Sequence, residues 1–110
     1  MKFVALIGHG PNWKAGRSVY EQGPVITEHL VAMCGLYDRG ALELGGPFER
    51  DGGIAVLDVD DEETAHAMMQ ADPGVLSGVM VYELHRLTAY FDAHHEVRTT
   101  ASVSHLAAQR

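Results

Sequence analysis

The pattern of hydrophobic and polar positions predicts strands and helices that follow one another in a regular order. Residues 2–9 form an apolar run with a period of two and two apolar faces, as in a central strand. Pro24 and Gly40 bracket a stretch with helical spacing, so we expect a helix from about Pro24 to Arg39. Apolar residues recur there at intervals of four, three and four, which predicts a core stripe made of Ile26, Leu30, Met33 and Tyr37.

The segment after this helix is typical of a hairpin. Residues 41–46 and 54–59 are short apolar stretches separated by turn residues, which predicts two paired strands. In the first of them we expect Leu42 and Leu44 to share one face, because side chains alternate along a strand.

A second helix and a last strand complete the pattern. Asp60 and Glu63 have the spacing of a helix cap, and Pro73 ends the helix that they begin. We expect this helix to face the core with Ala65, Met68 and Met69. Residues 79–90 then predict the final strand, and residues 92–110 read as a polar tail.

The order strand, helix, strand, strand, helix, strand is that of the ferredoxin-like βαββαβ sandwich, an α+β fold. Its four-stranded antiparallel sheet carries two helices on one face and leaves the other face open. Several of the predicted strands are apolar on both faces, and an exposed apolar patch usually marks an interface. We therefore expect a homodimer joined through the open sheet faces.

Composition and charge exclude several classes of partner. The 110 residues include 15 acidic and 8 basic ones, and the formal net charge of -7 repels nucleic acids and anionic membrane surfaces. The apolar run at residues 3–7 is too short for a secretion signal or a membrane span. The single cysteine, Cys34, suits a reducing compartment and reads as a small core residue. We expect a cytoplasmic protein that binds neither nucleic acid nor membrane.

Three short groups of residues carry the candidate chemistry. His29 projects beside the apolar stripe of the first helix, where a lone histidine is more often a core residue with satisfied nitrogens. Asp72 precedes Pro73 and can cap the turn that follows. Gly45-Gly46-Pro47 can be a plain strand end, or it can bring backbone amides close to a substrate oxygen.

Together with Gly10-Pro11-Asn12-Trp13, these groups resemble the YciI or YCII-related family over residues 1–91. The resemblance implies a ferredoxin-like domain, usually a dimeric α/β barrel, and an active site built from His29 and Asp72. The chain departs from the family pattern in its last strand, where Glu83-Leu84-His85-Arg86-Leu87 stands near the place of an aromatic pair. This departure concerns the lining of the pocket and hence the substrate.

Other residues are candidates for the pocket wall. Trp13 and Arg17 can line its mouth, where Arg17 suits an anionic substrate group, or Trp13 can pack on the sheet edge beside a solvated Arg17. His9, at the end of the first strand, is a further candidate. No phosphate-binding loop occurs, and we expect no cofactor. We expect no metal either, because structural metal spacing is missing from His94, His95, Glu96 and His105.

Two hypotheses follow from these residues. In the first, a small enzyme uses His29 as general base or acid, oriented by Asp72, for cofactor-free proton transfer or elimination on a small oxygen-bearing metabolite. Backbone amides near Gly45-Gly46 would hold the developing oxyanion. In the second, the protein is a non-catalytic dimeric module that binds a small molecule or another protein. The polar tail and the altered last strand favour this alternative.

Overall fold

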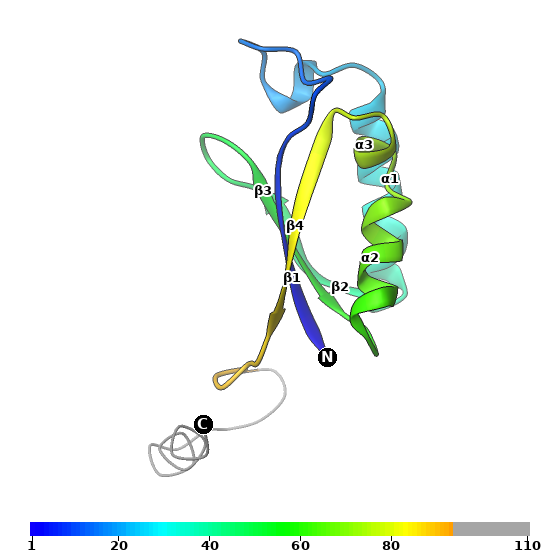
Figure 1. Ribbon diagram of the computed structural model, residues 1–110, viewed down its shortest axis with the longest axis vertical. Coiled ribbons are helices and arrows are strands. Elements are labelled where there is room, and N and C mark those ends of the chain that lie inside the picture. The colour runs from blue at the N-terminus through cyan, green and yellow to red at the C-terminus, as the bar shows by residue number, and fades with distance from the viewer. Residues whose placement is uncertain (94–110) are drawn as a thin grey trace.

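A computed structural model that describes residues 1–93 has the predicted βαββαβ order and adds two short helices, one in the predicted loop after the first strand and one in the predicted turn before the last strand. The elements are β1 (Lys2–His9), the short 3-10 helix η1 (Val19–Glu21), α1 (Val25–Asp38), β2 (Leu42–Pro47), β3 (Gly53–Asp58), α2 (Glu62–Gln70), α3 (Pro73–Leu76) and β4 (Met80–Leu87). The strands form one antiparallel sheet in the order β2-β3-β1-β4. Figure 1 shows the α-helices on one face of this sheet. This is the ferredoxin-like α+β fold.

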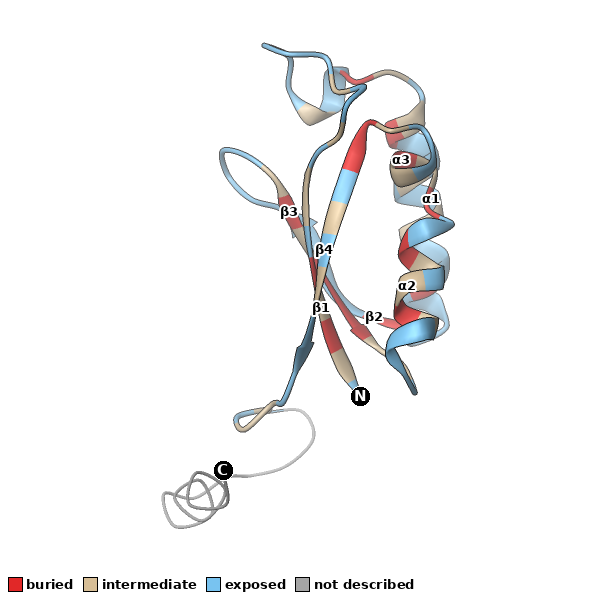
Figure 2. Ribbon diagram, viewed as in Figure 1, coloured by how far each residue is buried: buried red, intermediate tan, exposed pale blue. Residues whose placement is uncertain are grey.

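The hydrophobic core lies between the sheet and the helices, as the buried positions in Figure 2 show. Phe3 and Ala5 of β1 face the helices and are 1% and 0% exposed, whereas Leu6 on the other face is 40% exposed. Ala65 and Met69 of α2 are fully buried against this face, as predicted. Burying a side chain of the size of Phe or Met stabilises the fold by about 1.5–3 kcal/mol.

The face of α1 that packs on the sheet differs from the predicted one. Ile26 and Leu36 are buried, while Leu30 and Tyr37 are 56% and 62% exposed. Cys34 is exposed too, so its predicted place in the core is wrong. Spacings of three, four and three fit a helix of 3.6 residues per turn as well as four, three and four do. The ridge on the inner side therefore consists of Ile26, His29, Met33 and Leu36.

A bulge in β2 changes which side chains share a face. Leu42 pairs with Leu57 and Leu44 pairs with Val56, so the register shifts between the two leucines. Leu42 is buried under the helices, but Leu44 is 63% exposed on the open face. The predicted common face is wrong, because a bulge adds one residue and inverts the alternation.

The cap of α2 lies one residue later than the sequence pattern suggests. Asp61, and not Asp60, is the N-cap, and its Oδ1 accepts a hydrogen bond from the backbone N–H of Thr64 at 2.7 Å. Hydrogen bonding from Thr64 holds the pKa of Asp61 below its usual value, because these bonds stabilise the carboxylate. The cap fixes the start of a helix that ends close to Asp72.

The face of the sheet opposite the helices is not covered by any described helix (Figure 1). Leu6, Leu44 and Val81 lie on this face and are 40%, 63% and 46% exposed. The apolar surface that the sequence predicts for dimer formation is therefore accessible in the single chain, and the dimer itself stays a prediction.

Two further expectations concern membranes and the tail. Within residues 1–93, none of the helices has the length and the apolar character needed to cross a bilayer. Most of the polar tail, with His94, His95, Glu96 and His105, lies outside the described residues.

Candidate active site

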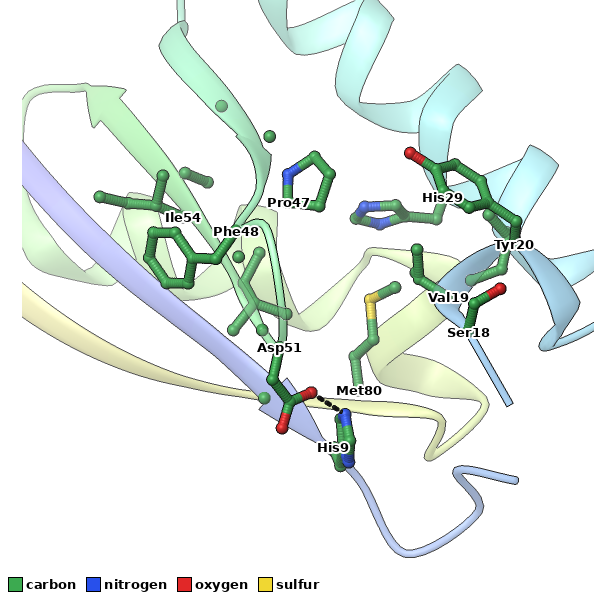
Figure 3. Close-up of a pocket in the computed structure, with 18 of the residues that line it drawn as sticks. His9, Ser18, Val19, Tyr20, His29, Pro47, Phe48, Asp51, Ile54 and Met80 are labelled. Atoms are coloured by element: carbon green, nitrogen blue, oxygen red, sulfur yellow. Dashed lines mark ion pairs between the residues drawn. The ribbon is translucent and has the colours of Figure 1, made fainter. Parts of the chain in front are cut away.

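A cavity of about 740 Å³ opens at the end of the sheet where β1 finishes. Its walls come from α1, the loop that follows β1, and the loop between β2 and β3 (Figure 3). The volume lies within the range of ordinary small-molecule sites. The cavity wall includes His29 and all the other predicted pocket residues, namely His9, Trp13, Arg17, Gly45, Gly46 and Pro47.

His29 and Asp72 come into direct contact, although they lie far apart in the sequence. The Nδ1 atom of His29 is 2.7 Å from Oδ2 of Asp72. The side chain of Asp72 is 1% exposed and that of His29 is 13% exposed. Asp72 does not line the cavity, so it supports His29 from behind. We call these two residues the buried pair.

The contact fixes which ring nitrogen of His29 remains for chemistry. A carboxylate accepts a hydrogen, so neutral His29 carries its hydrogen on Nδ1 and its lone pair on Nε2. The carboxylate also stabilises the cation that forms when Nε2 takes up a proton. Oδ1 of Asp72 is buried and has no hydrogen-bond partner among the described residues. The other carboxylate oxygen, Oδ2, contacts both His29 and the N-terminus of α3.

Asp72 holds its place because it also caps α3. Its Oδ2 accepts a hydrogen bond from the backbone N–H of Gly74 at 2.9 Å. Pro73 occupies the first turn of α3, where a backbone N–H would have no partner within the helix, so the lack of one in proline costs nothing. A side chain at Gly74 would place its Cβ 2.7 Å from the sulfur of Met80 and 2.9 Å from Oδ2 of Asp72. Both interpretations of Asp72 are therefore compatible, since one oxygen serves the cap and the histidine together.

The Gly10-Pro11-Asn12-Trp13 segment is tied to the turn before β4. The backbone N–H of Asn12 donates to Gly78 O at 2.8 Å, and its side-chain amide donates to Ser77 O at 2.8 Å. A Cβ on Gly10 would lie 2.2 Å from Gly78 O, so only glycine allows this close approach. These contacts place Trp13 at the cavity wall.

Gln22 organises the rest of this loop, and the sequence pattern did not indicate it. The residue is 3% exposed, and its Nε2 donates to the carbonyl oxygens of Lys14, Arg17 and Ser18 at 3.1, 3.3 and 3.2 Å. Its Oε1 accepts from the backbone N–H of Lys14 at 2.7 Å. A single glutamine in a loop has no periodic signal that could have revealed this role.

His9 has a carboxylate partner that the sequence also did not indicate. Its Nε2 contacts Oδ1 of Asp51 in the β2–β3 loop, shown by the dashed line in Figure 3. The ring of His9 stacks on Trp13 with centroids 3.8 Å apart and planes 9° apart. Asp51 precedes a glycine, and an aspartate is common in such a turn. The local sequence therefore gives no sign that Asp51 pairs with His9. We call His9 and Asp51 the loop pair.

The glycines of β2 leave room beside the backbone. β2 is an edge strand, so part of its backbone faces away from the sheet. No atom lies within 4 Å of a Cβ built on Gly46, whereas a Cβ on Gly45 would approach Ile54 O to 3.3 Å. A small ligand can therefore reach the backbone at Gly46, and the oxyanion role of these amides stays a prediction.

Ligands for a metal ion do not gather in the described part of the chain. Residues 1–93 contain no group of three or more His, Cys, Asp or Glu side chains that could hold one. Among these residues, the polar side chains that line the cavity are its two histidines together with Arg17, Ser18, Tyr20, Glu49, Arg50 and Asp51.

Comparisons with known proteins agree with the fold. The 5-chloro-2-hydroxyhydroquinone dehydrochlorinase from Burkholderia phenoliruptrix AC1100, solved in complex with 2,5-dihydroxybenzoquinone, is similar with a TM-score of 0.62 and 17% identity. The match covers 80% of this chain and 94% of that chain, and at this identity it shows the fold alone. No curated protein matches the chain. The model of the YCII-related domain matches residues 1–88. The chain belongs to the YCII-related family.

Proposed function

We propose that the protein is a small enzyme that moves a proton on an oxygen-bearing metabolite, with His29 as the general base or acid. The observation that carries this proposal is the 2.7 Å contact between His29 Nδ1 and Asp72 Oδ2 beside a cavity of about 740 Å³. Asp72 acts as a positioning residue, because it is buried behind the ring and does not reach the cavity. Membership of the YCII-related family supports an enzyme-like protein.

The geometry supports a simple proton-transfer step. Nε2 of neutral His29 takes a proton from a carbon next to a carbonyl group, and Asp72 stabilises the resulting imidazolium. The electron pair of the broken C–H bond forms a C=C bond, and negative charge develops on the carbonyl oxygen. Backbone amides near Gly46, or the side chain of Arg17, would stabilise that oxyanion. Return of the proton at another atom gives an isomerase, and loss of a leaving group gives a lyase.

The lining of the cavity supports a small and partly apolar substrate. Apolar side chains make up much of the cavity wall, with contributions from Ile26, Leu30, Met33, Leu42 and Met80. Charged side chains lie in the two loops, at Arg17, Glu49, Arg50 and Asp51. The bound 2,5-dihydroxybenzoquinone of the similar dehydrochlorinase is a ring with oxygen substituents. We propose an oxygen-bearing ring or chain of comparable size as the substrate class.

The proposal includes a homodimer joined through the open sheet faces and a cytoplasmic setting. The exposed apolar residues of that face support the dimer, and a Leu44→Lys variant would place a charge within it. We expect the variant to be monomeric in light scattering coupled to size exclusion, with an unchanged circular dichroism spectrum. A wild-type protein that is monomeric at micromolar concentration would contradict the dimer.

Hydrogen–deuterium exchange on a ketone tests the catalytic role of His29. Cyclohexanone in deuterated water, followed by proton NMR, reports removal of the proton next to the carbonyl. We expect the wild type to accelerate this exchange and His29→Asn to lose about 100-fold to 10,000-fold of the acceleration.

The matched control is His66→Asn. His66 lies outside the cavity and its Nδ1 contacts the hydroxyl of Tyr82, a bond that the amide of asparagine can replace. Exchange that survives in His29→Asn would refute the catalytic assignment. Binding of ketones without any exchange by the wild type would favour the non-catalytic binding module.

A further inference from the structure

The cavity has a second histidine whose surroundings differ from those of His29. Of the described residues that line it, His9 and His29 are the two histidines. His29 reaches the cavity from α1, while His9 stands at the end of β1, and Met80 lies between the two labelled rings in Figure 3. A small molecule in the cavity can therefore meet an imidazole at two different places.

The ring of His9 is held on one face and at one edge. Trp13 stacks on the face at a centroid distance of 3.8 Å, and Asp51 contacts Nε2 at the edge. At the other ring nitrogen, Nδ1, no hydrogen bond is found among residues 1–93. When both ring nitrogens of His9 carry hydrogen, Nε2–H donates to Asp51 and Nδ1–H is the hydrogen that remains for another acceptor.

The contact between His9 and Asp51 contributes little to the stability of the fold. The side chains of His9 and Asp51 are 39% and 69% exposed, and ion pairs with such exposure contribute about 0–1 kcal/mol. The same pair becomes stronger when a ligand fills the cavity, because electrostatic attraction grows as water is excluded. The loop pair is therefore better suited to act on a bound ligand than to hold the empty protein together.

We propose that His9 is a second catalytic residue, which donates a proton to the carbonyl oxygen at the end of the substrate remote from His29. This proposal rests on the proposed function of His29 and narrows the substrate to a conjugated carbonyl compound. The reacting carbon and the carbonyl oxygen must then be separated by at least one C=C bond, so that they lie at two ends of the molecule.

The step is balanced within the substrate and the two histidines. Nε2 of His29 removes a proton from carbon, and the C–H electron pair forms a new C=C bond. The conjugated C=C bond shifts, and the π pair of the carbonyl group moves onto oxygen. That oxygen takes the hydrogen from Nδ1 of His9, which becomes neutral as His29 becomes cationic. Loss of one proton from His29 to water and gain of one by His9 restore the starting state.

Two ketones of different reach test the proposal. In cyclohex-2-en-1-one the carbon beyond the C=C bond exchanges its hydrogen through the conjugated system, whereas cyclohexanone exchanges at the carbon next to the carbonyl. We expect His9→Gln to slow exchange of the conjugated ketone by about 100-fold and to slow that of cyclohexanone far less. The ratio of the two rates should therefore fall by at least about tenfold.

A second variant and a control distinguish a catalytic role of His9 from a role in shaping the cavity. Asp51→Asn retains a polar contact to His9 but loses the charge, so the same ratio should fall by about tenfold. His66→Asn should leave the ratio unchanged. Equal slowing of both ketones by His9→Gln would show that the loop pair only shapes the cavity, and unchanged exchange of the conjugated ketone would likewise overturn the proposal. Ketone exchange at the wild-type rate in His29→Asn would instead show that the proposed function itself is wrong.

Discussion

Two histidine–carboxylate pairs flank one cavity, and they are built in opposite ways. In the buried pair the carboxylate of Asp72 is 1% exposed and is fixed by a backbone hydrogen bond from Gly74. In the loop pair the carboxylate of Asp51 is 69% exposed and belongs to the turn between β2 and β3. The first pair is set by the fold before any ligand arrives, whereas the strength of the second depends on what covers it.

This difference matters because the effective dielectric constant decides how much a charge pair is worth. Two unit charges at about 4 Å attract by about 1 kcal/mol in water and by several-fold more where water is excluded. The energy of the loop pair therefore responds to the ligand, and that of the buried pair does not. The proposed roles, a fixed base in the buried pair and a ligand-dependent acid in the loop pair, suit a reaction that begins only when the substrate is in place.

Removal of the buried carboxylate should have the largest effect on stability. Asp72→Ala loses the cap of α3 and leaves the Nδ1–H of His29 without its acceptor. We expect a loss of about 2–4 kcal/mol of unfolding free energy, measured by urea denaturation.

Asp72→Asn is the matched control for this change. Its amide oxygen can still accept from Gly74 and His29, so stability should fall by less than about 1 kcal/mol while ketone exchange falls at least tenfold. A loss of stability in Asp72→Asn as large as in Asp72→Ala would contradict the separate roles of cap and charge.

A side chain at Gly74 should disturb the buried pair by crowding. The added Cβ of Gly74→Ala would lie 2.9 Å from Oδ2 of Asp72 and 2.7 Å from the sulfur of Met80. We expect destabilisation of about 1–3 kcal/mol by thermal or urea unfolding, together with slower ketone exchange. Gly35→Ala in α1 meets no atom within 4 Å and should instead stabilise by about 0.5–1 kcal/mol. Equal effects of the two substitutions would show that Gly74 is not needed for close packing.

Removal of the exposed carboxylate should change the loop pair without weakening the fold. Asp51→Ala should cost about 0–1 kcal/mol, because the pair is largely open to water. Trp13 is the only tryptophan of the chain and stacks on His9, so its fluorescence emission should change in this variant. A loss of stability comparable to that of Asp72→Ala would erase the distinction between the pairs.

The smallest effect is expected at a charged group far from the cavity, at the start of β1. A hydrogen bond to Glu43, together with the charges of Glu43, Asp58 and Asp92, raises the pKa of Lys2 above its ordinary value of 10.5. Its contribution to stability is therefore complete below about pH 10.5 and is lost as the pH rises through the raised value.

Unfolding of Lys2→Met should consequently show a weaker loss of stability between pH 10 and 12 than the wild type, with ketone exchange unchanged. Identical alkaline profiles of the two proteins would argue against a stabilising role for this group.

The sequence predicted those features that local patterns encode. Period-two runs located the strands, and the order of the elements gave the fold class. Asp72-Pro73-Gly74 indicated a cap, and the family resemblance indicated that His29 and Asp72 belong together. The prediction of which side of α1 packs inward was wrong. Two different ridges of this helix contain apolar residues at helical spacing, and packing against the sheet decides which of them is buried.

Other features depend on contacts that no local pattern carries. The bulge in β2 moved Leu44 to the open face, since one extra residue inverts the alternation. His9 and Asp51 meet only because β1 ends beside the β2–β3 loop, and the turn residues around Asp51 explain it without a partner. Gln22 acts on a loop that folds back on it, so its role appears only in three dimensions.

The side chain of Gln22 hydrogen-bonds to main-chain atoms of Lys14, Arg17 and Ser18, and this has a consequence for protein engineering. Side chains in this segment can be exchanged in a combinatorial library while the glutamine preserves the path of the chain. Gly16 should be spared, since its φ of 77° favours glycine. Arg17 and Ser18 face the cavity, so such a library would alter which molecules are accepted while both histidines keep their positions.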